Sequence, residues 1–213
     1  MKKHLLILAM ATLLAGCNQT VEQHESDQLP KPDANTVKMA LADALWNRHS
    51  TWQHTDNDIS NQELGYVLWA ATGINRPDEG GLTVPSAGNA QDIQVYVCRA
   101  NGTYLYNIAE HRLDKVSDKD IRDALSADDP QLRMGPTALL LVSDLKKFNG
   151  DLQFGRAMAP LDAGHVSENI VLMCTALGLN VVPRMKMDYD AVKQQLGLGD
   201  LQVPLLNIPI SKP

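Results

Sequence analysis

Positive charge, cysteine and metal-ligand patterns are all scarce in this sequence. Its 19 Lys and Arg side chains are outnumbered by 25 Asp and Glu, giving a formal net charge of -6, and such an acidic chain is not expected to bind nucleic acid non-specifically. The 6 His residues show no His-Glu-x-x-His spacing, so we expect no metal site. A Gly-x-Ser-x-Gly elbow and a dinucleotide fingerprint are also missing, which removes the usual signals of a serine hydrolase and of a dinucleotide-binding domain.

The N-terminal apolar run is too short to cross a membrane. Residues 1–3 are a basic start, and residues 5–14 form an apolar run of about ten residues, where a transmembrane helix needs roughly 20. A basic start, a short apolar run and small residues before a cleavage point describe a bacterial secretory signal peptide. Its end, Leu14-Ala15-Gly16-Cys17, resembles the lipobox of bacterial lipoproteins. That resemblance implies removal of residues 1–16 and acylation (palmitate) of Cys17; the alternative is a chance cysteine after a plain signal.

A lipidated Cys17 predicts a periplasmic lipoprotein anchored to the bacterial cell envelope, and Asn18 favours the outer membrane over the inner. Residues 17–34 are polar and contain two Pro, a composition that predicts a flexible tether. Residues 35–213 are then long enough for one domain with its own core. Cys98 and Cys174 lie in apolar patterns. We expect buried free thiols, although an oxidising periplasm would allow them to pair.

Hydrophobic periodicity divides this domain into helices and strands. An α+β sandwich is expected, with helices covering a mostly antiparallel sheet. Ser60 and Glu63 form a capping box, and Asn101-Gly102 predicts a two-residue hairpin turn. The expected helices cover residues 35–48, 61–72, 118–126, 161–179 and 188–197, and the expected strands cover 93–100, 103–108, 137–145, 180–183 and 201–210.

Two polar segments have the composition of binding loops. Arg48-His49-Ser50 follows the end of a helix, and an Arg fork with a Ser hydroxyl suits a phosphate monoester. The alternative is a surface Arg with a capping Ser. The segment "PSAGN", residues 85–89, is small and turn-forming, so it suits the edge of a flat heterocycle. The alternative there is an ordinary loop.

The order of these segments resembles the FMN-dependent nitroreductase family, and most closely its SagB-type subgroup, named for dehydrogenases of azoline-containing peptides. The matching pieces are "RHS", "QELGYVLWAATGINRP", "PSAGNAQDIQVYV", "GTYLYNIAEHRL" and "AGHVSENIVLMCTALGLNVVP". The resemblance implies an α+β homodimer with FMN in two interfacial clefts. The FMN-binding residues that it implies are Arg48, His49 and Ser50 for the phosphate and ribityl chain, Pro85, Ser86, Ala87 and Asn89 from the opposite subunit for the isoalloxazine, with Gln91 as a further candidate, and Met185 and Lys186 near N5.

The family resemblance predicts an FMN-dependent oxidoreductase that transfers a hydride through flavin N5, with NAD(P)H as a candidate electron donor and a small molecule or peptide as substrate. No catalytic side chain is required. Two departures stand against it: Trp52 replaces a residue that is often basic in the family, and Lys212 is the only cation after the last strand. They favour an alternative, a flavin-poor nitroreductase-fold lipoprotein acting as a binding module. A third hypothesis is a structural envelope lipoprotein with a partner.

Overall fold

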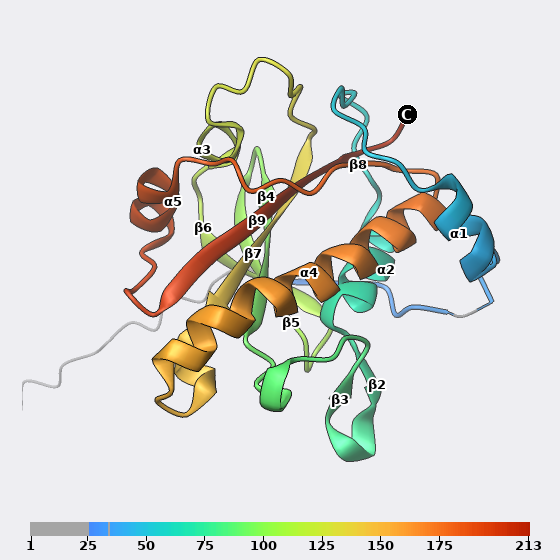
Figure 1. Cartoon of the computed structure of the whole chain (residues 1–213). Coiled ribbons are helices and arrows are strands. Elements are labelled where there is room, and N and C mark those ends of the chain that lie inside the picture. The colour runs from blue at the N-terminus through green and yellow to red at the C-terminus, as the bar shows by residue number, and fades with distance from the viewer. Residues whose placement is uncertain (1–25, 34) are drawn as a thin grey trace, which may run out of the picture.

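The computed structural model describes residues 26–33 and 35–213 (Figure 1). Its centre is a seven-stranded sheet with the order β1-β6-β5-β4-β7-β9-β8, and every pairing in it is antiparallel. The fold class predicted from the sequence is therefore confirmed. The strands are β1 (Ser26–Gln28), β4 (Ile93–Arg99), β5 (Gly102–Asn107), β6 (Arg112–Ser117), β7 (Thr137–Asp144), β8 (Asn180–Val181) and β9 (Gln202–Ser211), with a separate pair β2 (Ile74–Arg76) and β3 (Gly81–Leu82).

Helices cover both faces of the sheet. They are α1 (Leu41–Asn47), α2 (Asn61–Thr72), α3 (Arg122–Ser126), α4 (Leu152–Ala176) and α5 (Tyr189–Leu196). Successive strand residues point to opposite faces. In β4, Val95 and Val97 therefore pack under α2 and α4, while Tyr96 and Cys98 pack under α3 and α5. Figure 1 shows α4 crossing the whole of the first face.

The predicted capping box at the start of α2 is confirmed. The Ser60 hydroxyl accepts a hydrogen bond from the Glu63 N–H at 3.2 Å, and the Glu63 carboxylate accepts one from the Ser60 N–H at 2.7 Å. These two bonds satisfy N–H groups that a helix start leaves without a partner. The helix packs its apolar residues, Leu64 and Leu68 among them, into the core under α4.

Several predicted boundaries are wrong. The first helix begins at Leu41 rather than near residue 35, and α4 begins at Leu152 rather than 161. The sequence interpretation stopped at Pro160, but α4 continues through it, and Asp151 caps the helix by accepting from the Phe154 N–H. The hairpin loop lies one residue earlier than predicted, because Gly102 already pairs with Arg99. Strand β6 was not predicted, and it completes a three-strand meander with β4 and β5.

Part of the expected tether belongs to the domain. Strand β1 pairs with β6 from Ser26 to Gln28, and Leu29 is only 2% exposed. A Cβ atom at Gly65 would lie 2.9 Å from the Pro30 carbonyl oxygen, so this glycine allows residues 29–33 to lie against α2. The prediction of a flexible tether is therefore wrong for residues 26–33. Residues 26–28 pair with the edge of β6 through main-chain hydrogen bonds, and the residues that follow lie against α2. Residues 17–25, with Cys17, lie outside the described residues.

The cysteines of the domain are free and buried, as expected. Cys98 packs on the α3 and α5 face of the sheet and Cys174 packs on the α4 face, so they cannot pair. Burial raises the pKa of the Cys98 thiol to about 12. Among the helices of residues 26–33 and 35–213, none is long and apolar enough to cross a membrane.

Candidate functional site

The segment Arg48-His49-Ser50 leaves the end of α1 as an extended chain. The Arg48 N–H still closes the helix on the Ala44 carbonyl at 2.9 Å, and the Thr51 N–H donates to the Val181 carbonyl of β8 at 3.0 Å. The three side chains between these anchors are exposed. Within the described part of the chain, no residue pairs with the Arg48 guanidinium or the Ser50 hydroxyl. This segment therefore offers a free cation and a free hydroxyl next to β8.

A hollow of about 280 Å³ lies beside this segment, between α1, the end of α4 and β8. It is lined by residues that include His49, Thr175, Gly178, Asn180 and Pro213. The His49 Nδ1 atom lies 3.0 Å from the Asn47 carbonyl oxygen. Lys212, the cation expected to help at this end, instead forms an ion pair with Glu63 at 3.2 Å. Arg48, the neighbour of His49 in the chain, is thus the candidate cation beside the hollow.

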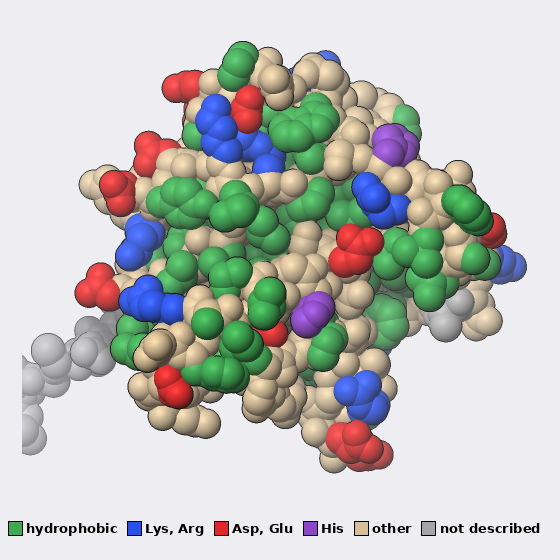
Figure 2. Space-filling view, in the orientation of Figure 1, with side chains coloured by type: hydrophobic (Ala, Val, Ile, Leu, Met, Phe, Trp, Pro, Cys, Tyr) green, Lys and Arg blue, Asp and Glu red, His purple; other side chains and the backbone are tan. Residues whose placement is uncertain are grey.

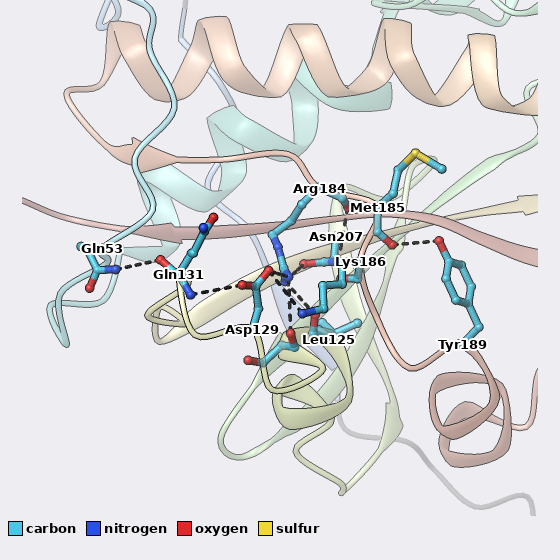
Figure 3. Close-up of polar contacts among 10 residues, drawn as sticks. Gln53, Leu125, Asp129, Gln131, Arg184, Met185, Lys186, Tyr189 and Asn207 are labelled. Atoms are coloured by element: carbon cyan, nitrogen blue, oxygen red, sulfur yellow. Dashed lines mark hydrogen bonds and ion pairs between the residues drawn. The ribbon is translucent and has the colours of Figure 1, made fainter.

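The loop after β8 carries Met185 and Lys186, and three of its carbonyl groups accept hydrogen bonds from side chains. Arg184 exchanges backbone hydrogen bonds of 2.9 Å with Asn207 of β9. The Asn207 side chain donates to the carbonyls of Arg184, at 3.3 Å, and Lys186, at 2.9 Å. The Tyr189 hydroxyl donates to the carbonyl of Met185 at 2.8 Å (Figure 3).

The backbone N–H groups of Met185 and Lys186 are left open by this arrangement. Among residues 26–33 and 35–213, none accepts a hydrogen bond from either group. The Met185 side chain is 67% exposed, and that of Lys186 is also exposed, with its amine 3.8 Å from Asp129. This loop therefore presents two N–H donors and a flexible apolar side chain to a ligand. The structure places it next to β8, as it does Arg48.

Arg184 is a buried residue that the sequence interpretation did not single out. Its guanidinium donates to the Leu125 carbonyl at 2.9 Å, the Ser126 carbonyl at 3.3 Å, the Asp129 carboxylate at 2.8 Å and the Asn207 side chain at 3.2 Å. The Gln131 N–H and this guanidinium hold the pKa of Asp129 below its usual range. Nothing in the sequence pointed to Arg184, because its partners come from two distant segments, residues 125–129 and Asn207 of β9.

The "PSAGN" segment lies at a different end of the molecule. It forms a short 3-10 helix, Ala87–Asn89, below the sheet, whereas α1 lies beyond the other end of α4 (Figure 1). Gly88 and Asn89 adopt left-handed backbone angles, with φ of 58° and 53°. Pro85, Ser86 and Asn89 line a hollow of about 390 Å³ together with Arg76. Within one chain, therefore, residues 85–89 are not brought to Arg48 or to Met185.

Two buried carboxyl groups lie beneath this segment, and neither was predicted. The Asp162 carboxylate of α4 accepts the Ala87 N–H with both oxygens at 3.0 Å. Asp92 is fully buried, and the Ser143 hydroxyl donates to one of its oxygens. Burial, together with the neighbouring Asp162, raises the pKa of Asp92 to about 6 despite the bond from Ser143. The Gln91 side chain donates a hydrogen bond to the Gly80 carbonyl at 2.9 Å, which connects the segment after residues 85–89 to the turn between β2 and β3.

Apolar side chains are exposed beside both groups of residues. On α1, Trp46 is 87% exposed, and Leu41 and Leu45 are exposed next to it; on α4, Leu161 is exposed. Figure 2 shows hydrophobic side chains gathered along α4 and over α1 on one face of the molecule. Apolar surface of this kind marks an interaction site more often than a simple solvent face.

Comparison with known proteins gives a consistent result. The family model described as "Nitroreductase family" matches residues 45–211. A "Putative nitroreductase" of Methanocaldococcus jannaschii is 26% identical over 198 residues, covering 87% of this chain and 96% of that protein. The crystal structure of a second "putative nitroreductase", from Ralstonia eutropha JMP134, matches this chain with a TM-score of 0.83 and 28% identity, and the match covers 90% of each chain.

A more distant structure extends the comparison of the fold. The microcin synthetase McbBCD complex of E. coli, solved with truncated pro-MccB17 bound, matches with a TM-score of 0.71 and 18% identity. The match covers 97% of this chain and 84% of that chain. At this identity the likeness concerns the fold alone. Since the family model spans most of the domain and the structural matches span nearly all of it, the chain belongs to the nitroreductase family.

Proposed function

We propose that this chain is an FMN-dependent oxidoreductase that transfers a hydride through flavin N5. The observation that carries this is the pair of open N–H groups at Met185 and Lys186 close to the unpaired Arg48. Thr51 is bonded to Val181, and the four residues from there to Met185 reach at most about 14 Å. A cation and N–H donors that both lie near β8 suit a ligand with an anionic group at one end and an acceptor on a flat ring at the other, as in FMN.

The residues near β8 each fit a part of FMN. Arg48 and Ser50, with His49 beside them, would hold the phosphate and the ribityl hydroxyls through charge-assisted hydrogen bonds. A backbone N–H of Met185 or Lys186 would donate to N5 of the oxidised ring and fix its orientation. Bound FMN supplies the two-electron chemistry, and the protein supplies binding and electrostatic tuning. Solvent can supply the proton, so no side-chain acid or base is needed.

We propose a homodimer, in which Pro85, Ser86, Ala87 and Asn89 of one subunit line the flavin held by the other. The support is that residues 85–89 lie apart from Arg48 within one chain, so that a second copy is needed to bring the two sets together. The exposed apolar side chains of α1 and α4, with Trp46 the most exposed, supply a surface for that contact.

The proposed substrate and the proposed direction of the redox reaction follow from the resemblance to the SagB-type subgroup. That resemblance suggests a peptide or small-molecule substrate that reduces the flavin, so that the chain acts as a dehydrogenase. NAD(P)H remains the candidate donor for the reverse, reductase direction, but it is scarce outside the cytoplasm. A test is anaerobic mixing of the flavin-loaded protein with each class of reductant, following the loss of flavin absorbance.

We also propose that the domain is tethered to the cell envelope through acylated Cys17. The sequence of residues 1–17 is the support, since the described residues begin at Ser26. Fractionation of cells that express the full chain should find it in the membrane pellet, in the outer-membrane fraction if Asn18 acts as expected. Cys17→Ser should move it to the soluble fraction, and a Cys17→Ser chain that stays in the pellet would contradict the lipid anchor.

The first experiment is a visible spectrum of the purified chain with and without added FMN. A flavin spectrum at about one per subunit is expected. Arg48→Ala should weaken FMN binding about 10- to 100-fold, the equivalent of a hydrogen bond to a charged group. Arg156→Ala, at the other end of α4, is the matched control and should bind FMN normally. Protein that stays colourless and ignores FMN would overturn the proposal.

The alternative is a binding module that has lost flavin. Two observations favour it: Trp52 stands, partly exposed, where the family often has a cation, and Lys212 is paired with Glu63 instead of being free for a phosphate. The same spectrum decides between the two functions, since a module without flavin would show no bound FMN and no effect of Arg48→Ala.

A further inference from the structure

Three buried or half-buried side chains from separate segments form one polar network behind the Met185 loop. We name Asp129, Arg184 and Asn207 the Arg184 network. Arg184 bonds to the Asp129 carboxylate at 2.8 Å and to the Asn207 side chain at 3.2 Å, and Asn207 is fully buried in β9 (Figure 3). Buried polar groups of this kind are rigid when they are satisfied, because breaking any one bond leaves a donor or acceptor without a partner.

The effect of this network on the loop is directional. The Asn207 amide takes the carbonyls of Arg184 and Lys186, and the Tyr189 hydroxyl takes the carbonyl of Met185. Because the N–H of a peptide group points opposite to its C=O, the Asn207 contact fixes the direction of the Met185 N–H, and the Tyr189 contact fixes that of the Lys186 N–H. The direction of the Met185 and Lys186 N–H groups is thus set by the Asn207 and Tyr189 side chains rather than by the loop itself.

The segment that carries Asp129 also reaches the other side of the proposed cleft. The Gln53 side chain donates to the Gln131 carbonyl at 2.8 Å, and the Arg133 N–H donates to the Trp52 carbonyl at 3.0 Å. The Gln131 N–H in turn donates to the Asp129 carboxylate at 3.1 Å. Residues 129–133 therefore connect the chain that follows Arg48-His49-Ser50 to the loop that carries Met185.

We infer that the Arg184 network, with Tyr189, positions the Met185 and Lys186 N–H groups and so sets the reduction potential of the bound flavin. These are positioning residues, since they act through the backbone of the loop. The inference rests on the proposed function. An N–H donor facing N5 stabilises the oxidised ring, in which N5 is an acceptor, more than the reduced ring, in which N5 carries a hydrogen. Loosening the loop therefore raises the potential.

The test uses two variants of different severity. Asp129→Asn keeps the shape of the side chain but removes the charge that pairs with Arg184. Tyr189→Phe removes only the hydroxyl that holds the Met185 carbonyl, on a side chain that is 40% exposed, so folding is not at risk. Asp120→Asn is the matched control, because it breaks another Asp–Arg pair, with Arg122, that is not part of the Arg184 network.

Two quantities are measured on the full chain. The first is the midpoint potential of bound FMN, expected to rise in both variants by about 10–30 mV, which is a 2- to 10-fold change in the relative affinity for the two redox states. The second needs no flavin: amide hydrogen exchange at Arg184 and Asp188, whose N–H groups bond to Asn207 and Ala124. Asp129→Asn should speed this exchange about tenfold.

The outcomes separate the inference from the proposed function. A higher potential in Asp129→Asn and Tyr189→Phe, with Asp120→Asn unchanged, supports the inference. A wild-type chain that binds FMN while both variants keep its potential overturns the inference alone, even where amide exchange is faster, since the network would then be merely structural. A wild-type chain that does not bind FMN overturns the proposed function and the inference with it. If Asp129→Asn fails to fold, Tyr189→Phe decides.

Discussion

The buried carboxyl group of Asp92 should lower the free energy of unfolding at neutral pH, compared with an uncharged side chain of the same shape. Asp92 lies at the start of β4 with no exposed surface, next to Asp162, and one of its oxygens has no hydrogen-bond partner among the described residues. The informative change is Asp92→Asn. An amide keeps the shape, can still accept from the Ser143 hydroxyl, and can donate to Asp162, but it carries no charge.

The size of the effect follows from the pKa. Burial raises the pKa of Asp92 from 3.8 to about 6, a difference that corresponds to about 3 kcal/mol. Between these two pH values the folded chain keeps a proton that the unfolded chain has released. The free energy of unfolding therefore falls as the pH rises through this window, and the full loss is present above pH 6. Asp92→Asn should remove it.

The assay is urea unfolding at two pH values. At pH 8, Asp92→Asn should raise the free energy of unfolding by about 3 kcal/mol, and at pH 4.5 the gain should shrink to about 1 kcal/mol. Asp200→Asn, an exposed carboxylate, is the control and should change neither value. A gain that is equal at both pH values, or a loss of stability at pH 8, would refute the reasoning that the cost of burying the charge dominates this site.

Three further predictions concern stability. Ser60→Ala should lower the free energy of unfolding by about 1 kcal/mol, because the hydroxyl caps α2 at the Glu63 N–H; an unchanged urea midpoint would contradict this. Burial lowers the pKa of His54 to about 4, so the unfolded chain takes up a proton first as the pH falls, and by pH 5 this removes about 2 kcal/mol. His54→Leu should flatten that dependence, and an unchanged slope of stability against pH would count against it. Leu140→Ala, in the centre of β7, should reduce stability by about 2–5 kcal/mol, and a loss under 1 kcal/mol would show that the surrounding core collapses onto the site.

The features that depend only on neighbouring residues were predicted correctly from the sequence. The capping box at Ser60 and the apolar run of β7 each depend on neighbours within a few residues, and both were predicted correctly. The start of α4 was missed because Pro160 reads as a helix break, although its missing N–H and ring were accommodated within the helix. Strand β1 was missed because its pairing with β6 uses main-chain groups, which leave no mark on side-chain composition.

The candidate site was also predicted only in part from the sequence. Arg48, Ser50 and the small residues 85–89 have residue types that suit an anion and a flat ring, but it was the order of the motifs, and the family resemblance that this order carries, that singled them out. The structure then brought the chain that follows Arg48 and the loop that carries Met185 to β8, and put residues 85–89 against the N-terminal half of α4. The sequence could not show that Asp129, Arg184 and Asn207 meet, since they lie in three segments.

The sequence by itself determined the mostly antiparallel α+β class, most of the helices and central strands, and the residue types available for an anion and a flat ring. Those properties follow from periodicity and from short-range capping and turn chemistry, which act within a few residues. Only the tertiary structure decided which polar groups are buried together, as in the Asp92 and Asp162 pair and the Arg184 network. Burial and hydrogen bonding between distant segments set pKa values and the direction of backbone N–H groups, and both depend on the packed sheet rather than on any one stretch of chain.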